Sequence, residues 1–388
     1  MNLSGDRFIT GGENIYPSYE GDHFFTFAEP PDRFILESGI PLGPITVNYQ
    51  TYGTLSPGGD NAVYLAHALT GGSLAGKHSS PEKESGWWEP LVGPGKAIDT
   101  DRFFVVCSNV LGSCYGTTGP SSIDLSRGKN YAMNFPVVTI GDMVRVQKKL
   151  LDHLGVRELV CVAGGSMGGM QALQWAAYYP DMVRSVIAVA CSAVFSPIGI
   201  AFNQAERKAI MNDPSWRQGD YYGTSFPHSG LSLARMIGTI TYRSNESFEQ
   251  RFGRSFQNAE RCNQFAFHEQ FAVESYLNYQ GEKVTYRFDP NSYLYLSKAM
   301  DLHDLGRGFT SFQAALKRIR SPIFLMGINT DILFYPQEVR GLAVEMRRCG
   351  IDAFYEELKS PHGHDSFLIE FKEMERYIKY CLSEAEKQ

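Results

Sequence analysis

The most informative segment for the fold is Leu159-Val-Cys-Val-Ala-Gly-Gly-Ser-Met-Gly-Gly-Met-Gln-Ala-Leu173. Its first five residues are continuously apolar, as a strand must be when both faces of a parallel sheet are covered. A serine on a glycine-rich turn follows, and residues 167–179 have the composition of a helix that ends at Pro180. The segment therefore predicts a strand, a tight turn that presents Ser166, and a helix.

The pattern Gly164-x-Ser166-x-Gly168 is common among proteins, and it becomes specific here because a predicted strand precedes it and a predicted helix follows it. A serine on such a strained turn needs neighbours without bulk, and it lies at a helix N-terminus that favours negative charge. A turn that merely contains a serine is the plainer alternative. A phosphate-binding loop is excluded because no Lys-Ser/Thr follows and the Gly-x-Gly-x-x-Gly pattern is not met. We interpret the segment as the nucleophile elbow of an α/β-hydrolase fold, with Ser166 as nucleophile.

Further apolar runs predict a mostly parallel central sheet with helices on both faces. Residues 45–52 alternate, as a partly exposed antiparallel strand does. Largely apolar strands are expected at residues 62–66, 103–107, 183–190, 323–327 and 353–358. Further helices are expected at residues 142–154, from about 336, and from about 366 to close the chain. Residues 195–305 are helical, aromatic and polar, so we expect a core of residues 1–194 and 306–388 with 195–305 as a helical lid insertion.

Composition narrows the class of protein. The 388 residues carry a net charge of −6, so no global basic field attracts nucleic acid, and an anionic ligand needs a local basic pocket. No apolar window is long enough for a membrane span, and residues 1–22 look like a loosely ordered leader and not a signal peptide. The seven cysteines are irregularly spaced, which favours a reducing cytoplasm over a disulfide framework or zinc site. We expect no metal.

A serine nucleophile needs a general base and an acid that orients the base. In this fold the chain order is serine, acid, histidine. His364, in a loop after the last strand, is the expected base, with His362 as the less favoured twin. Asp331 follows the buried run 323–327 and is the expected orienter, although a capping aspartate is the alternative reading. Asp365 adjoins His364 in sequence and is expected to point elsewhere.

The oxyanion of an acyl-transfer intermediate needs two preorganised N–H donors. Met167, directly after the nucleophile, is expected to supply one of them. The loop 67–72 after an earlier buried strand is expected to supply the other. We choose Leu69 within that loop and leave Thr70 as its alternative.

These residues carry a more specific resemblance. The chain resembles the homoserine O-acyltransferase family of α/β-hydrolase-fold enzymes, which acts on the route to methionine, from about residue 33 to about residue 380. The principal matching segments are His67-Ala-Leu-Thr-Gly71, Gly86-Trp-Trp-Glu-Pro-Leu-Val-Gly-Pro-Gly95, Ser108-Asn-Val-Leu-Gly-Ser-Cys-Tyr-Gly-Thr-Thr-Gly-Pro120, Gly164-Gly-Ser-Met-Gly-Gly-Met-Gln-Ala-Leu173, Gly230-Leu-Ser-Leu-Ala-Arg-Met-Ile-Gly238 and His362-Gly-His-Asp-Ser-Phe-Leu368.

The resemblance implies ping-pong transfer of an acyl group from acyl-CoA to L-homoserine, with acyl-CoA as co-substrate and no permanently bound cofactor. It assigns Arg235 to the substrate carboxylate, places Tyr242 in the same pocket, and gives Asp365 the substrate ammonium. A zwitterion suits this combination of a guanidinium and a carboxylate. The resemblance also implies a homodimer joined through the lid helices. The sequence leaves open whether the donor is acetyl-CoA or succinyl-CoA, and whether the acceptor is homoserine, serine or another alcohol. A carboxylesterase of the same fold also remains an alternative.

Overall fold

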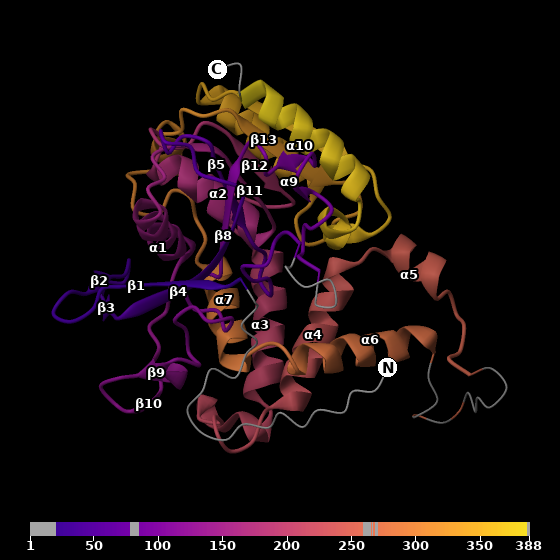
Figure 1. The fold of residues 1–388 in the computed structure, drawn as a ribbon. Coiled ribbons are helices and arrows are strands. Elements are labelled where there is room, and N and C mark those ends of the chain that lie inside the picture. The colour runs from indigo at the N-terminus through magenta and orange to yellow at the C-terminus, as the bar shows by residue number, and fades with distance from the viewer. Residues whose placement is uncertain (1–20, 78–84, 259–264, 266, 268–270, 386–388) are drawn as a thin grey trace.

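A computed structural model describes residues 21–77, 85–258, 265, 267 and 271–385, so most of the expected leader 1–22 lies outside the described residues. An eight-stranded sheet with the order β1-β4-β8-β5-β11-β12-β13-β14 runs through the molecule (Figure 1). Its strands are β1 (His23–Phe27), β4 (Ile45–Tyr52), β5 (Ala62–Ala66), β8 (Phe104–Ser108), β11 (Leu159–Gly165), β12 (Val186–Val189), β13 (Ile323–Ile328) and β14 (Ala353–Leu358). Two-stranded pairs β2 (Phe34–Ile35) with β3 (Pro41–Leu42), β6 (Val92–Gly93) with β7 (Ile98–Asp99), and β9 (Ile123–Asp124) with β10 (Lys129–Asn130) lie outside it.

The predicted strands are confirmed to within a few residues, and their directions follow the expectation. β8, β5, β11, β12, β13 and β14 pair in parallel, and β4 pairs antiparallel with both β1 and β8. The alternation expected for β4 is found only in part, because Thr46, Thr51 and Tyr52 are half-buried but the four consecutive residues from Val47 to Gln50 are buried. The two buried polar side chains of β4 form hydrogen bonds: Asn48 accepts one from the Ser73 hydroxyl at 2.5 Å, and Gln50 donates one to Asp22 at 3.0 Å.

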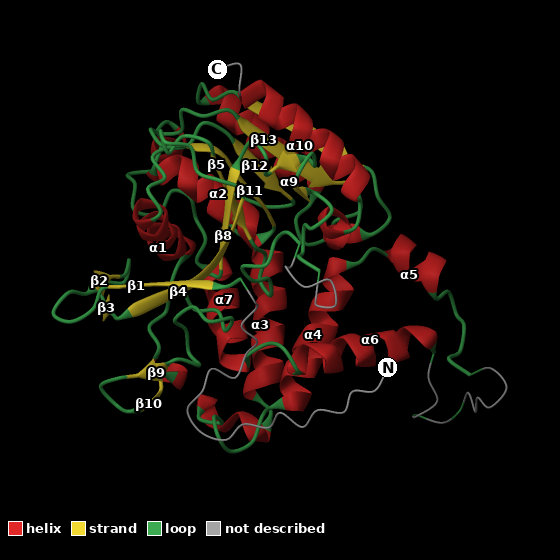
Figure 2. Cartoon of the chain, viewed as in Figure 1, coloured by secondary structure: helices red, strands yellow, loops and turns green. Residues whose placement is uncertain are grey.

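Helices cover both faces of the sheet (Figure 2). Successive strand residues alternate between two apolar clusters, as the period of two in a strand requires: Val162 packs on one side and Cys161 on the other. One cluster includes residues of α1 (Ile140–His153), α2 (Met167–Tyr178) and α9 (Pro336–Arg348). The other includes residues of α10 (Phe371–Ala385) and the segment around Trp88. The small α8 (Phe312–Leu316) precedes β13.

Between β12 and β13 the chain leaves the sheet and forms a separate group of helices, labelled α3 to α7 in Figure 1. They are α3 (Pro197–Met211), α4 (His228–Tyr242), α5 (Asn245–Arg251), α6 (Ala272–Thr285) and α7 (Pro290–Asp301), with a 3-10 turn at Pro214–Gly219. The two ends of this excursion meet, because Val194 and Asp304 form an antiparallel bridge. Leu305 N also donates to Ala193 O at 2.8 Å. Among the described residues, no helix has the length and apolar character needed to cross a membrane.

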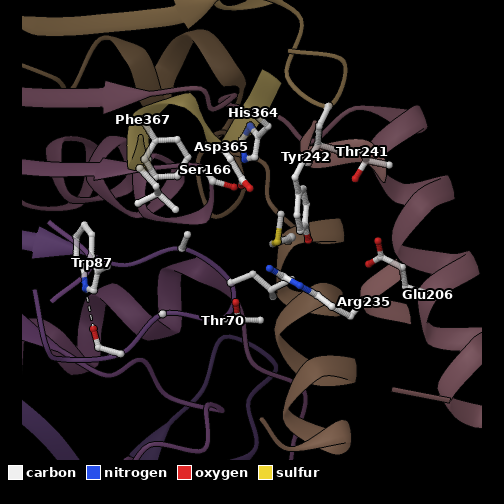
Figure 3. A pocket seen from close by; sticks show the side chains of 18 of the residues that line it. Thr70, Trp87, Ser166, Glu206, Arg235, Thr241, Tyr242, His364, Asp365 and Phe367 are labelled. Atoms are coloured by element: carbon white, nitrogen blue, oxygen red, sulfur yellow. Dashed lines mark hydrogen bonds between the residues drawn. The ribbon is translucent and has the colours of Figure 1, made fainter. Parts of the chain in front are cut away.

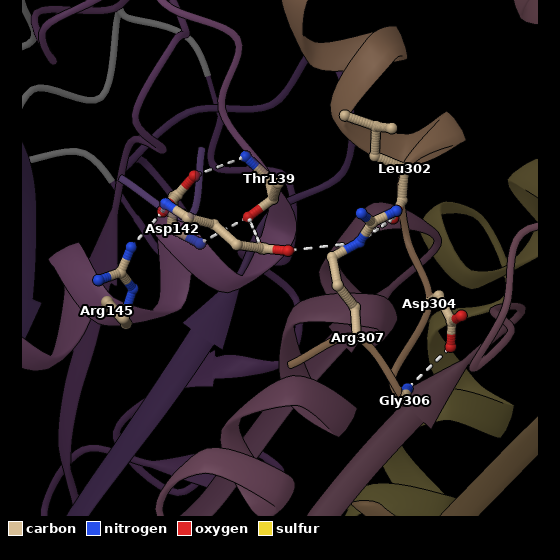
Figure 4. Close-up of polar contacts among 8 residues, drawn as sticks. Thr139, Asp142, Arg145, Leu302, Asp304, Gly306 and Arg307 are labelled. Atoms are coloured by element: carbon tan, nitrogen blue, oxygen red, sulfur yellow. Dashed lines mark hydrogen bonds and ion pairs between the residues drawn. The ribbon is translucent and has the colours of Figure 1, made fainter. Parts of the chain in front are cut away.

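A polar network, buried at Thr139 and Asp142 and exposed at Glu37 and Arg307, ties this excursion to the core (Figure 4). The α1 N-terminus forms a capping box in which Thr139 and Asp142 bond each other's backbone N–H groups, and this satisfies donors that a helix start leaves open. Glu37 accepts from the Thr139 hydroxyl at 2.7 Å and pairs with Arg307 at 3.4 Å. Arg307 in turn donates to Leu302 O at the end of α7. The network thus joins three segments that are distant in sequence.

The closing helix starts later than predicted. A 3-10 turn, η3, spans Gly363–Leu368, and α10 begins only at Phe371. The Phe367 carbonyl accepts the Trp88 indole N–H at 3.0 Å, so the backbone there is engaged by the core and not by a continuing helix. This turn holds His364 at the carboxyl edge of the sheet.

Candidate active site

Ser166 lies on a strained turn between β11 and α2. Its backbone has φ 58° and ψ −126°, an uncommon conformation for a residue with a side chain. A Cβ on Gly168 would lie 2.0 Å from Ala66 O, and one on Gly164 would lie 2.6 Å from the same atom. Glycine is therefore required at both flanking positions, because the turn packs directly against the end of β5. This is the geometry that the sequence predicted for a nucleophile elbow.

His364 and Asp331 meet although 33 residues separate them in the chain. His364 Nδ1 lies 2.7 Å from Asp331 Oδ2, and both side chains are almost completely buried. The second Asp331 oxygen accepts the backbone N–H groups of Leu333 and Phe334 at 2.8 and 2.9 Å. The carboxylate is thus fixed by its own turn while it orients the imidazole. His362 lies instead 3.8 Å from Glu370 and does not line the cavity of Ser166.

The surroundings of His364 favour the protonated form of its imidazole. Burial by itself lowers the pKa of the imidazole, but the charge and hydrogen bond of Asp331, with a contribution from Asp365, outweigh it and raise the pKa above 6.5. Ser166 and His364 line the same cavity, and the hydrogen bonds of the described residues do not include one between their side chains. Catalytic contacts of this kind commonly tighten only when substrate binds.

Both candidate oxyanion donors lie at the Ser166 turn. Within the described residues, the Met167 and Leu69 amides donate to no protein acceptor. The Gln171 side-chain amide donates to both Met167 O and His67 O, each at 3.1 Å, and so fixes the two segments relative to each other. Thr70, the alternative to Leu69, is engaged through its carbonyl oxygen, which accepts from Arg287 at 3.0 Å.

His67 organises this loop, a role that was not predicted from the sequence. Its Nε2 accepts the Val110 N–H at 3.1 Å, so Nδ1 carries the proton and donates to Ala68 O at 2.7 Å. Burial lowers the pKa of His67 to about 4, and the ring therefore stays neutral. The signal for it was its position at the start of the matching segment 67–71.

The residues expected to bind the amino acid line the same cavity as Ser166, and this cavity has a volume of about 300 Å³ (Figure 3). Arg235 and Tyr242 come from one face of α4, with the guanidinium 5.4 Å from the ring centroid. Asp365 lines the cavity beside His364, and its carboxylate lies 3.3 Å from Arg243. As expected, Asp365 does not orient His364, because Asp331 occupies that position.

A buried carboxyl that the sequence did not reveal also lines this cavity. Glu206 on α3 accepts a hydrogen bond from the Tyr293 hydroxyl at 2.9 Å, and Figure 3 shows its side chain near that of Arg235. Burial raises the pKa of Glu206 to about 7, although the Tyr293 hydrogen bond and the Arg235 and Arg207 charges oppose the shift. The burial of Glu206 could not be predicted from helical spacing, because a glutamate on an amphipathic helix is ordinarily solvent-exposed.

Comparison with known proteins agrees with this geometry. Residues 61–368 match the family model of the alpha/beta hydrolase fold. The chain is 52% identical over 340 residues to homoserine O-acetyltransferase of Carboxydothermus hydrogenoformans, covering 87% of this chain and 90% of that protein. The solved homoserine O-acetyltransferase of Bacillus anthracis superposes with a TM-score of 0.85 at 31% identity, covering 93% and 97% of the two chains. Esterase E22 superposes equally well at 28% identity, covering 93% and 99%. The identity, the coverage and the matching fold together show that the chain belongs to the homoserine O-acetyltransferase family of α/β-hydrolase-fold enzymes.

Proposed function

We propose that the protein transfers an acetyl group from acetyl-CoA to the side-chain hydroxyl of L-homoserine, as a cytoplasmic step in methionine biosynthesis. The observation that carries the proposal is the common cavity. A serine on a strained elbow faces the same space as a guanidinium, Arg235, and a carboxylate, Asp365. A hydrolase needs only the first of these features. An enzyme that receives an amino acid needs a group for each end of the zwitterion.

In the first half-reaction, His364 removes the Ser166 hydroxyl proton as the oxygen attacks the thioester carbonyl. The Met167 and Leu69 amides stabilise the negative charge on the former carbonyl oxygen. Collapse breaks the carbon–sulfur bond, and the proton on His364 passes to the departing CoA sulfur. Asp331 stabilises the imidazolium and holds the ring in the tautomer that presents Nε2.

In the second half-reaction, His364 takes the proton of the homoserine hydroxyl, whose oxygen attacks the acyl-serine carbonyl. The bond to Ser166 then breaks, and the serine oxygen recovers its proton from His364. Arg235 and Asp365 hold the carboxylate and ammonium so that the hydroxyl, and not water, lies next to the ester. Tyr242 supports the Arg235 guanidinium by stacking on it.

We infer that residues 195–305 act as a lid that completes this pocket, since α3 and α4 contribute Glu206, Arg235 and Tyr242 to it.

The same helices are proposed to join two copies into a homodimer. Residues 233 and 240 lie seven apart on α4, on the face away from Arg235 and Tyr242. Leu233 and Ile240 there are 49% and 47% exposed, which is high for large apolar side chains.

The decisive experiment follows CoA release from acetyl-CoA with and without L-homoserine. We expect a single-turnover burst and an acetyl adduct on Ser166 without acceptor, and continuous turnover only with homoserine. Ser166→Ala should lose both the adduct and turnover, and an adduct that persists in this variant would contradict the nucleophile assignment. Succinyl-CoA and L-serine, offered in the same matrix, define donor and acceptor preference.

A carboxylesterase is the second candidate, because esterase E22 shares the fold at a TM-score of 0.85. Ester hydrolysis uses the same serine, base and oxyanion donors and differs only in the acceptor. Equal CoA release with and without homoserine would favour this alternative.

A further inference from the structure

A chain of buried polar side chains runs from helix α1 to the carboxyl edge of the sheet. The Trp175 indole donates to Gln147 Oε1 at 2.8 Å, and Gln147 Nε2 donates to Gln171 Oε1 at 2.7 Å. Gln171 Nε2 then donates to His67 O and to Met167 O, each at 3.1 Å. The three side chains are fully or almost fully buried, so they can act on a substrate only through the groups that they hold.

The chemistry of the two ends of this chain fixes the orientation of both amides. An indole N–H can only donate, so Gln147 turns its oxygen to Trp175 and its NH2 group to Gln171. Gln171 therefore accepts through its oxygen and presents its NH2 group to two backbone carbonyls, which can only accept. Only one arrangement of the two amides keeps all four hydrogen bonds.

The proposed oxyanion donor Leu69 is oriented by the carbonyl of its own peptide group. In a trans peptide the N–H and the C=O point in opposite directions, so a bond to one sets the direction of the other. Ala68 O accepts from His67 Nδ1 at 2.7 Å and from Gly71 N at 2.9 Å. These two bonds therefore set the direction of the Leu69 N–H.

The second proposed donor, Met167, is oriented in the same way, because Ser166 O accepts from Met170 N at 3.1 Å. These local bonds do not set how the two donor segments lie relative to each other. β5 and β11 pair side by side, and beyond their ends the Gln171 amide bridges the segments. Each carbonyl that it bonds belongs to the peptide group next to a donor peptide.

We propose that Gln171 is a positioning residue for acylation, whose NH2 group holds the Leu69 and Met167 donors at the separation that the oxyanion requires. The inference rests on the proposed function, because it concerns the serine acylation with which that function begins. Two N–H donors stabilise an oxyanion together only if both point at the place that it occupies. A displacement of about 1 Å can cost about a hundredfold in rate, so a bridge between the donors affects catalysis without touching the substrate.

Gln171→Met tests the inference, since methionine is an unbranched side chain of similar length that has no N–H to donate. We expect the rate of Ser166 acylation by acetyl-CoA, measured without homoserine, to fall about a hundredfold, while the Kd for CoA changes by less than about twofold. The Ki for a trifluoromethyl ketone analogue of acetyl-CoA should rise about as much as the rate falls. In its adduct the Ser166 oxygen bonds the ketone carbon, the hydroxyl proton passes to His364, and the negatively charged oxygen occupies the oxyanion hole.

Tyr295→Phe is the matched control, because the buried Tyr295 hydroxyl also contacts two backbone carbonyls, those of Met133 and Phe135. Urea unfolding should show lower stability in both variants, but the acylation rate and the ketone Ki should change only in Gln171→Met. Gln171→Glu gives a second variant should the methionine variant not fold. A buried glutamic acid stays neutral and can donate to one of the two carbonyls, so its acylation rate should lie between those of the wild-type protein and Gln171→Met.

An unchanged acylation rate in folded Gln171→Met, a wild-type rate in Gln171→Glu, or an equal fall in Tyr295→Phe would overturn the inference. Equal losses of affinity for CoA and for the ketone would also overturn it, because a general distortion of the site would explain both. Failure of the proposed function gives a different result, since acetyl-CoA would then not acylate the wild-type protein. Acylation by p-nitrophenyl acetate, an activated ester without CoA, would still compare the variants in that case.

Discussion

Asp331 shows how one side chain serves both the fold and the chemistry of the proposed triad. One of its carboxylate oxygens accepts two backbone N–H groups of its own turn, and the other accepts from His364 at 2.7 Å. Asp331 therefore performs both of the roles considered from the sequence: it caps its own turn and it orients the imidazole. A carboxylate fixed in this way costs little reorganisation when His364 becomes positively charged.

The raised pKa of His364 has a consequence for rate. Only the neutral imidazole accepts the Ser166 proton, so the rate of acylation should fall as pH drops through the pKa of His364, which lies above 6.5. Asp365→Asn removes one of the charges that raise this pKa and should move the acidic limb to lower pH. We would measure kcat/KM for acetyl-CoA against pH in the acylation half-reaction, without homoserine, so that the amino-acid pocket is not tested at the same time.

Asp352→Asn is the control for this pH profile, since Asp352 is exposed and lies outside the cavity. Its profile should match that of the wild-type protein. A limb that stays in place in Asp365→Asn would show that the Asp365 charge does not reach the imidazole.

The site is assembled by the ends of elements. β5, β11 and β13 are parallel neighbours or near neighbours, so the loops after them meet at one edge of the sheet, where such folds place function. Helix α2 starts in direct contact with the end of β5. The glycines of the β11–α2 turn permit this close approach because they have no side chain. Gln171, one turn into α2, then bonds both sides of the junction.

Gly168→Ala tests this close approach. The new methyl group would lie 2.0 Å from Ala66 O, so the turn must shift, and we expect a loss of stability of about 1–3 kcal/mol with loss of acylation. Urea unfolding and the acetyl-adduct assay measure the two effects. Gly341→Ala is the control, because this glycine lies on an exposed part of α9 with no atom within 4 Å of the new methyl group, and alanine there should stabilise by about 0.5–1 kcal/mol. Equal stability of the two variants would contradict the packing argument.

At the scale of the whole molecule, α4 connects two surfaces. One face presents Arg235 and Tyr242 to the cavity, and the other presents Leu233 and Ile240 to solvent. If that outer face joins two copies, the amino-acid pocket is held in place in part by the dimer. Residues bound to substrate and residues bound to a second copy would then lie on a single helix.

Leu233→Asp combined with Ile240→Asp tests the dimer proposal. Two carboxylates on the proposed apolar interface would have to lose their hydration, so we expect monomers at micromolar concentration where the wild-type protein is dimeric, as judged by sedimentation velocity. Val344→Asp, an exposed apolar position on α9 of the core, should leave the dimer intact. A wild-type protein that sediments as a monomer would refute the proposal.

The strand–turn–helix around Ser166 and the parallel strands could be predicted from the sequence alone. These features are local: periodicity, glycine at a tight turn and continuous apolar runs are written within a few residues. Which distant side chains meet could be learned only from the folded molecule. How separate elements pack decides the contact of Asp331 with His364, the burial of Glu206 and the organising role of His67. No local pattern encodes that packing, because it is set by the shared burial of surfaces far apart in the chain.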